Sequence, residues 1–171
     1  IIPEFYLSVE PRNRPVLRPH KDTTFLIASR CDPQMFKDLK DYNVMVWHAW
    51  GNDDENIFLH ECTAYGGGPT SGVRAISIGY AQGFRNFHLY GMDSCLIENE
   101  KRLGQGEIAD TVKTIPVIVN GKKFVCTMAM ADQANNFQEL YSFLPDVHIE
   151  SFGPGLISGI LEGRKAAGLP V

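Results

Sequence analysis

The chain has 171 residues, of which 44% are hydrophobic and 21% charged, and its formal net charge is −4. This length suits one well-cored domain and is short for two ordinary ones, so we expect a single domain over residues 1–171. No apolar run approaches the ~20 residues that a membrane helix needs. The 16 basic residues are scattered along the chain. We therefore expect neither membrane insertion nor binding of duplex nucleic acid.

The cysteines and the first residues bear on the setting of the chain. Cys31, Cys62, Cys95 and Cys126 form no C-x-x-C pair and have no histidine at ligand spacing. This pattern favours reduced core thiols in a cytoplasmic protein over a metal site or a disulfide framework. The chain begins Ile1-Ile2-Pro3, without a start methionine, which predicts that an upstream segment is missing.

The first half of the chain alternates strands with a helix. Asp32 is expected to cap a helix that runs from Pro33 through about Lys40. The third expected strand, Val44 to Ala49, shows little alternation between apolar and polar side chains, which predicts that both of its faces are buried. The strands are expected at Phe5 to Val9, Thr23 to Ser29 and Val44 to Ala49.

The second half continues the alternation. Asn120-Gly121 favours a type I′ turn, which predicts a β-hairpin near residues 115–126. The polar stretch from Cys95 to Thr114 is expected to be an excursion over the active face. The remaining elements expected are a helix at Val73 to Phe84, a strand at Asn86 to Tyr90, a helix at about Met128 to Phe143 with Met128 and Met130 in the core, a strand at Val147 to Ser151, and a last helix bearing Leu156, Ile157, Ile160 and Leu161.

Strands separated by helices imply right-handed crossovers. We therefore predict an α/β fold, a three-layer Rossmann-like domain with a mostly parallel sheet. Ligands of such sheets bind outside the carboxyl ends of the strands. That edge is expected to carry Ser8 to Glu10, Ser29-Arg30, His48, the loop from Gly66, Asp93 and the loop from Gly153.

The glycine-rich loop is the most informative motif on this edge. Gly66, Gly67, Gly68, Pro69, Thr70, Ser71 and Gly72 run directly into a predicted helix. Glycines let a ligand approach the backbone closely. The hydroxyl groups of Thr70 and Ser71 are expected to lie beside the N–H groups of the first helical turn. Such a helix start favours an anion, and we expect phosphate, although the loop matches neither the P-loop nor the dinucleotide fingerprint.

The run GGGPTSGVRAISIGYAQGFRNFHLYGMDS resembles the core of the MptE-like proteins, which are named for the archaeal 6-hydroxymethylpterin diphosphokinase and include bacterial motility accessory factors. Ile2 to Pro11 and Gly153-Pro154-Gly155 are similar to two further family segments. A more distant likeness is to bacterial sialyltransferases that use CMP-sialic acid. Those families carry an upstream strand and a G-P-S-[LM] loop that would precede Ile1, which implies that half of the nucleotide site lies outside this chain.

The resemblance implies a nucleotide-dependent transferase with a nucleotide or nucleotide-sugar donor and a small-molecule or sugar acceptor. Thr70, Ser71 and Gly72 match the donor-contacting loop, and Asp93 matches the strand-end carboxylate. A nucleoside triphosphate donor would bring Mg²⁺ to Asp93, with Glu10 as a second ligand, whereas a CMP-sugar needs no metal. A non-catalytic nucleotide- or sugar-binding module and, from the fold alone, an NAD-dependent dehydrogenase are alternatives. The sequence leaves open whether the chain forms a homo-oligomer.

Each of these residues also has a structural interpretation. Asp93 is either a ligand for a ribose or a metal, or a cap for the following turn. Glu10 is either a ligand or a solvated carboxylate, and Arg74 pairs either with phosphate or with a nearby acid. His48 is either a general base or a packed histidine. His88 is expected to be in the core or facing the sheet, and the basic segment with Arg12, Arg14, Arg18 and His20 either holds an anionic substrate or is solvated.

Overall fold

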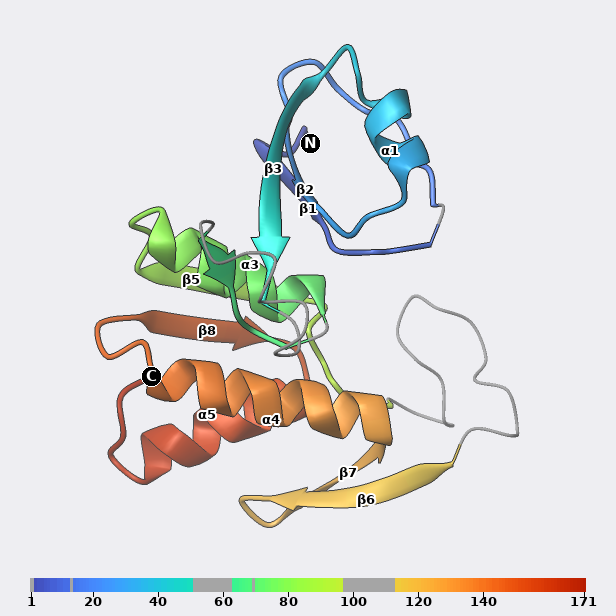
Figure 1. Cartoon of the computed structure of the whole chain (residues 1–171). Coiled ribbons are helices and arrows are strands. Elements are labelled where there is room, and N and C mark those ends of the chain that lie inside the picture. The colour runs from blue at the N-terminus through green and yellow to red at the C-terminus, as the bar shows by residue number, and fades with distance from the viewer. Residues whose placement is uncertain (1, 13, 51–62, 69, 97–112) are drawn as a thin grey trace. The chain divides into compact units, whose positions relative to one another are not determined.

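The computed structural model describes residues 2–12, 14–50, 63–68, 70–96 and 113–171 (Figure 1). The chain divides into two compact units, Ile1–Ala75 and Ile76–Val171, and helix α3 (Ser71–Ala81) crosses the boundary. The expected α/β class with mostly parallel strands is confirmed. The single-domain organisation stays a prediction. None of the described helices combines the length and apolarity needed to cross a membrane.

The first unit contains a parallel sheet in the order β1-β2-β3-β4. Its helix α1 (Pro33–Asp38) begins as predicted, with the Asp32 side chain accepting a hydrogen bond of 2.7 Å from the Gln34 amide. Phe25, Ile27 and Leu39 are almost fully buried and form the core. The strands are β1 (Phe5–Ser8), β2 (Thr24–Ala28), β3 (Asn43–Ala49) and β4 (Ala64–Tyr65).

The prediction that β3 is buried on both faces is wrong. Met45 and Val46 are 52% and 56% exposed, whereas Trp47 and Ala49 are buried. Burial is thus confined to the carboxyl half of the strand. A continuous apolar run cannot distinguish a strand covered along its whole length from one covered at one end.

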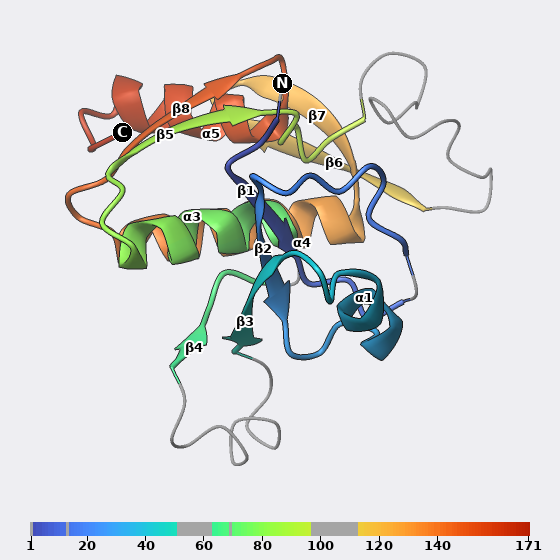
Figure 2. The same cartoon turned by 90° about the horizontal axis from the view of Figure 1, so that it is seen from above.

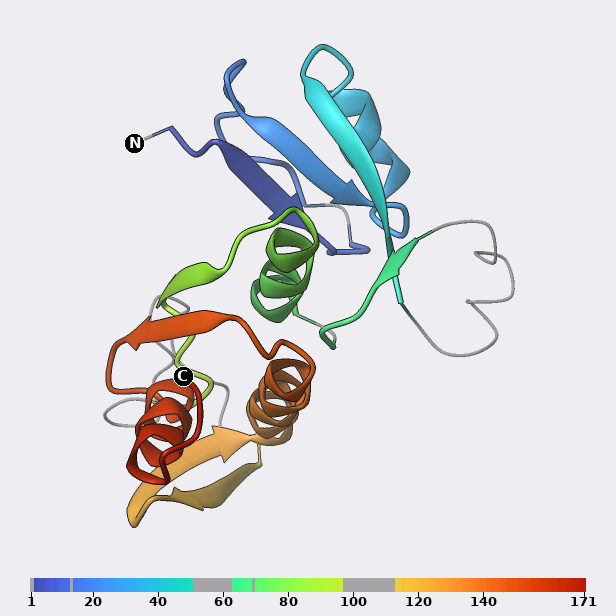
Figure 3. The ribbon, with the colours of Figure 1, turned by 90° about the vertical axis from the view of Figure 1, so that its left-hand side faces the viewer.

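The second unit has three layers. The parallel pair β5–β8 is one layer, α4 and α5 lie side by side as the next, and the antiparallel hairpin β6–β7 is the third (Figures 2 and 3). The described strands therefore form three sheets in the chain as a whole. The elements are β5 (Asn86–Tyr90), β6 (Thr114–Val119), β7 (Lys122–Thr127), α4 (Met128–Ser142), β8 (His148–Phe152) and α5 (Leu156–Ala166).

Most predictions for this unit are confirmed. Asn120 and Gly121 both have positive φ, 51° and 75°, as a type I′ turn requires. Met130 is buried on α4, but Met128 is 58% exposed because it begins the helix, so its assignment to the core is wrong. His88 is not in the core either. It lies on the exposed face of β5, 3.7 Å from the carboxylate of its cross-strand partner Glu150.

Helix α3 is displaced from its predicted range. It begins at Ser71, two residues early, so Ser71 and Gly72 belong to its first turn. It ends at Ala81 because Gly83 adopts a φ of 97°. The Gly83 and Phe84 amides donate to the carbonyls of Tyr80 and Gly79, both at 3.0 Å, which is the Schellman arrangement that closes a helix.

Candidate functional site

The carboxyl ends of β1 to β4 meet at one edge of the sheet in the first unit, because all four strands are parallel. Every predicted site residue except Asp93 follows or ends one of these strands. Glu10 follows β1, His48 lies near the end of β3, and the loop from Gly66 follows β4. Open parallel sheets bind ligands at this edge, so we take it as the candidate site.

His48 and Ser29 are paired on this edge. The His48 Nδ1 atom lies 3.0 Å from the Ser29 hydroxyl oxygen, and the Ser29 amide donates to the Trp47 carbonyl at 2.8 Å. The histidine is half-buried and the serine exposed. One ring nitrogen is thereby held by Ser29, which directly follows β2, while Nε2 has no hydrogen bond to a described residue. This is the arrangement in which a histidine can exchange a proton through its second nitrogen.

The glycine loop folds back on the helix that it precedes. Gly67 and Gly68 have φ of 112° and 70°, which residues with a side chain rarely adopt. A Cβ atom at Gly67 would lie 3.2 Å from the Arg74 amide nitrogen and Cα. The first helical hydrogen bond runs from the Arg74 amide to the Thr70 carbonyl, at 3.2 Å. The loop therefore lies against the first turn of α3, whose leading N–H groups have no acceptor within the helix. Pro69 lies outside the described residues.

Arg74 holds the loop to the sheet. It is only 4% exposed, and its guanidinium donates to the carbonyls of Tyr65, at 2.5 Å, and Trp50, at 3.0 Å. Its carbon atom Cζ lies 5.9 Å from the centre of the Trp47 ring. These contacts tie the ends of β3 and β4 to the first turn of α3. Its predicted pairing with phosphate stays a prediction.

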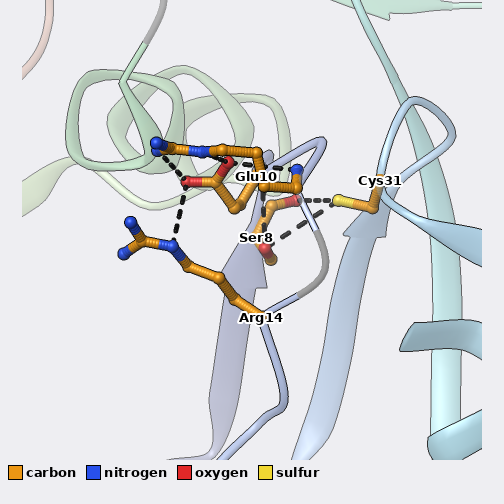
Figure 4. A network of polar contacts seen from close by, with 5 residues as sticks. Ser8, Glu10, Arg14 and Cys31 are labelled. Atoms are coloured by element: carbon orange, nitrogen blue, oxygen red, sulfur yellow. Dashed lines mark hydrogen bonds and ion pairs between the residues drawn. The ribbon is translucent and has the colours of Figure 1, made fainter. Parts of the chain in front are cut away.

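Glu10 is engaged by arginines (Figure 4). Its two carboxylate oxygens accept from Arg12 Nε at 2.6 Å and from a terminal Arg12 nitrogen at 2.8 Å, and Arg14 Nε lies 3.8 Å away. The hydrogen bonds from Arg12 are the main cause that lowers the pKa of Glu10 to about 2. Ser8 and Cys31 fix the start of this segment, since the Glu10 amide lies 3.4 Å from the Ser8 hydroxyl and Cys31 Sγ lies 3.5 Å from the Ser8 carbonyl.

Asp93 belongs to the second unit, after β5. Its carbonyl accepts from the Leu156 amide at 2.7 Å, so its backbone caps the start of α5. It lines a pocket of about 90 Å³ that also includes Ser94, Met130 and Gln133. Ser94 has a φ of 52° and is 7% exposed, and its hydroxyl has no hydrogen-bond partner among the described residues. Nothing in the sequence marks the strained conformation of Ser94.

Glu10, the predicted second magnesium ligand, is bonded to Arg12. Both oxygens of Glu10 accept hydrogen bonds from Arg12, so this carboxylate would have to leave its partner to bind a cation. Within the described parts of the chain, no three histidine, cysteine or acidic side chains are grouped as metal ligands. We therefore derive no step that uses a metal ion, and a metal at Asp93 stays a prediction.

The described cysteines are core residues, as predicted. Cys31, Cys95 and Cys126 are buried free thiols, and burial raises the pKa of each. Cys62 lies outside the described residues, as does most of the excursion predicted between Cys95 and Thr114. At the start of that stretch, Leu96 forms an antiparallel bridge with Val125.

Comparison of the chain with protein-family models, with curated proteins and with solved structures finds no match. The resemblance to the MptE-like proteins is therefore carried by the residues quoted above and stays a prediction.

Proposed function

We propose that this chain is a nucleotide-dependent transferase of the MptE-like type, which holds the phosphates of its donor on residues 66–72. The observation that carries the proposal is the conformation of this loop. Gly67 and Gly68 take left-handed φ values and place the loop against the first turn of α3. Such a turn presents N–H groups and a positive partial charge to an anion. Thr70 and Ser71 add hydroxyl groups at the same place.

The reaction needs a group that accepts a proton from the attacking hydroxyl, and His48 suits this role. Its Nδ1 contacts Ser29, which leaves Nε2 for the acceptor. The acceptor oxygen forms a bond to the transferred group while the bond to the leaving nucleotide phosphate breaks. The proton of the acceptor passes to Nε2. The loop amides and the start of α3 stabilise the charge that develops on the leaving phosphate.

A second candidate is transfer of a sugar from a CMP-activated donor. The observation that favours it is the pairing of Glu10 with Arg12, because this carboxylate, one of the two predicted to hold Mg²⁺, would have to leave Arg12 to bind the ion. The His48–Ser29 pair and the loop amides serve this reaction without a metal ion. Asp93 lies in the second unit, and both candidates are argued without it.

Binding of nucleotides tests the proposal. Thermal unfolding is measured with ATP, GTP, CTP, CMP and NAD, each with and without Mg²⁺. A ligand at a hundredfold excess over its Kd adds about 2.7 kcal/mol of stability. A shift that depends on Mg²⁺ with ATP or GTP supports diphosphate transfer, and a shift with CMP or CTP in the absence of metal supports sugar transfer. Absence of a shift with every nucleotide contradicts the proposal.

Two variants of α3 locate the binding site. Ser71→Glu places a carboxylate in the first turn, where a helix tolerates negative charge, so the fold is preserved while phosphate is repelled. Ala75→Glu makes the same charge change one turn later, at an exposed position. The proposal expects Ser71→Glu to abolish the nucleotide shift and Ala75→Glu to retain it. Equal loss in both variants would place the nucleotide elsewhere.

A variant of His48 separates binding from chemistry. His48→Gln keeps a polar side chain of similar size but cannot take up a proton near neutral pH. We expect nucleotide binding to be retained and donor turnover to fall by about 10²-fold or more. Unchanged turnover would show that His48 is a packing residue, the structural interpretation that the sequence leaves open.

A further inference from the structure

The arginines next to Glu10 are not used by the proposed donor site. Arg12 and Arg14 follow β1 and are 71% and 65% exposed. They share a single carboxylate, so the three side chains together carry a net positive charge. An ordinary surface ion pair is neutral and contributes little. A pair of guanidinium groups on one carboxylate instead retains attraction for a further anion.

The geometry leaves hydrogen-bond donors for that anion. Arg12 uses Nε and one terminal nitrogen on Glu10, so the N–H groups of its other terminal nitrogen point elsewhere. Arg14 Nε lies 3.8 Å from Glu10, beyond hydrogen-bond distance, and Arg14 makes no other polar contact with the described residues. Figure 4 shows Arg14 Nε facing the Glu10 carboxylate, with the two terminal nitrogens of the guanidinium beyond it. Guanidinium groups bind carboxylates and phosphates through two parallel N–H bonds.

The position of the arginines distinguishes them from the donor site. The strand order is β1-β2-β3-β4, so this cluster and the glycine loop occupy opposite ends of the same sheet edge. Neighbouring strands lie about 4.8 Å apart, so β1 and β4 themselves are separated by about 14 Å. Between them, Ser29 follows β2 and His48 lies near the end of β3. A donor on the loop and a second molecule on the arginines would thus have the proposed base between them.

We infer that Arg12 and Arg14, oriented by Glu10, bind an anionic group of the acceptor, either a carboxylate or a phosphate. This inference rests on the proposed function, because it assigns the acceptor to the far end of the donor's sheet edge. Glu10 is then a positioning residue, which orients two arginines in place of its predicted role as a metal ligand. The low pKa of Glu10 keeps the cluster ionised at any pH at which the protein would work.

Titration with simple anions tests the inference. Inorganic phosphate and acetate, as separate probes, are added to protein whose arginine Nε–H groups are followed by NMR. We expect the Arg12 and Arg14 signals to shift with one or both probes, and the better probe identifies the anionic group. If neither probe shifts these signals, the inference is wrong. Binding of nucleotide is measured in the same samples, so failure of the donor site is seen separately.

A matched pair of double variants supplies the control. Arg12→Gln with Arg14→Gln and Lys37→Gln with Lys40→Gln each remove two exposed positive charges from the first unit. We expect the arginine variant to bind the probe about tenfold more weakly or worse, with nucleotide binding unchanged, and the lysine variant to bind both normally. If the two variants lose binding of the probe equally, the probe is attracted non-specifically by positive charge. If the arginine variant loses binding of both the probe and the nucleotide, the arginines belong to the donor site. Either result overturns the inference.

Discussion

Gly155 lies so close to Asp93 that a Cβ atom at position 155 would be 2.4 Å from the Asp93 Cα and 2.5 Å from its carbonyl oxygen. The same carbonyl accepts the first amide hydrogen bond of α5, from Leu156 at 2.7 Å. The glycine therefore lets the turn after β8 lie against the backbone that follows β5. The two strands of the parallel pair are joined at their carboxyl ends by this contact.

Replacement of Gly155 by alanine is expected to destabilise the second unit. The atoms that a methyl group would meet belong mainly to the backbone and cannot rotate away, so we expect a loss of about 1–3 kcal/mol or more in the free energy of unfolding. Urea unfolding followed by far-UV circular dichroism measures it. Gly163→Ala is the control, because its nearest neighbour would be the Asn120 Cβ at 3.7 Å. In a helix interior that change is expected to be neutral or stabilising.

The elements that the sequence predicts well are those specified by local patterns. The hairpin depends on Asn120-Gly121, whose positive φ values follow from the residue types. Helix α4 buries Met130, Ala134 and Phe137, which recur at helical spacing. In these segments a short stretch of chain contains all the information that determines its structure.

The parts that escape prediction depend on partners distant in the sequence or on geometry without a residue signature. The contacts of Arg74 with Tyr65 and Trp50 require the two strand ends to be in place first. The strained φ of Ser94 has no marker in the residue types. Glu10 is different, since Arg12 and Arg14 follow it at short spacing and the pairing could have been inferred. The order of the strands at the sheet edge, which relates the arginines to the glycine loop, needs the structure.

Arg74 is expected to stabilise the first unit through buried hydrogen bonds. Arg74→Ala would remove the donors from two carbonyls, and hydrogen bonds to charged groups contribute about 1.5–3 kcal/mol each. We expect a loss of about 2–4 kcal/mol, because solvent can replace part of the interaction. Both tryptophans of the chain, Trp47 and Trp50, lie in this unit, so tryptophan fluorescence during urea unfolding reports it.

A surface arginine provides the comparison for that measurement. Arg12→Ala removes a guanidinium that is 71% exposed, and exposed ion pairs contribute about 0–1 kcal/mol. We expect the urea midpoint of Arg12→Ala to lie close to that of the unchanged protein. If the midpoint of Arg74→Ala lies equally close, the assignment of Arg74 to the structural core is wrong.

Cys126 is expected to be unreactive in the folded protein. Its thiol is fully buried, and its pKa is raised to about 11. Burial is the larger cause of this shift, and the neighbouring Cys95 is the smaller. At neutral pH about one thiol in ten thousand would be ionised. Alkylation with iodoacetamide followed by mass spectrometry should leave the peptide that contains Cys126 unmodified in buffer and modify it in concentrated urea. Similar modification rates in the two conditions would show that this part of α4 and β7 opens readily.

Asp146 is expected to make the second unit sensitive to acid. Its carboxylate oxygens accept from the Tyr80 hydroxyl and from Arg85 Nε, each at 2.7 Å. The Tyr80 hydrogen bond, and then that of Arg85, lowers the pKa of Asp146 below 3.8. A carboxylate with a lowered pKa contributes stability above its unfolded pKa and loses it as the pH falls through the folded pKa. The contribution should therefore be full at neutral pH and absent in strong acid.

The Asp146→Asn variant tests that sign. We expect a lower thermal midpoint than that of the unchanged protein at neutral pH, and a difference that shrinks as the pH falls below 3.8. Glu139→Gln makes the same charge change at an exposed position on α4 and should leave the midpoint at neutral pH nearly unchanged. Tyr80→Phe removes the larger cause of the shift, so it should raise the pKa of Asp146 toward its ordinary value in an NMR titration of the carboxyl carbon. A difference between Asp146→Asn and the unchanged protein that stays constant into strong acid would show that the side chain acts through its shape and not through its charge.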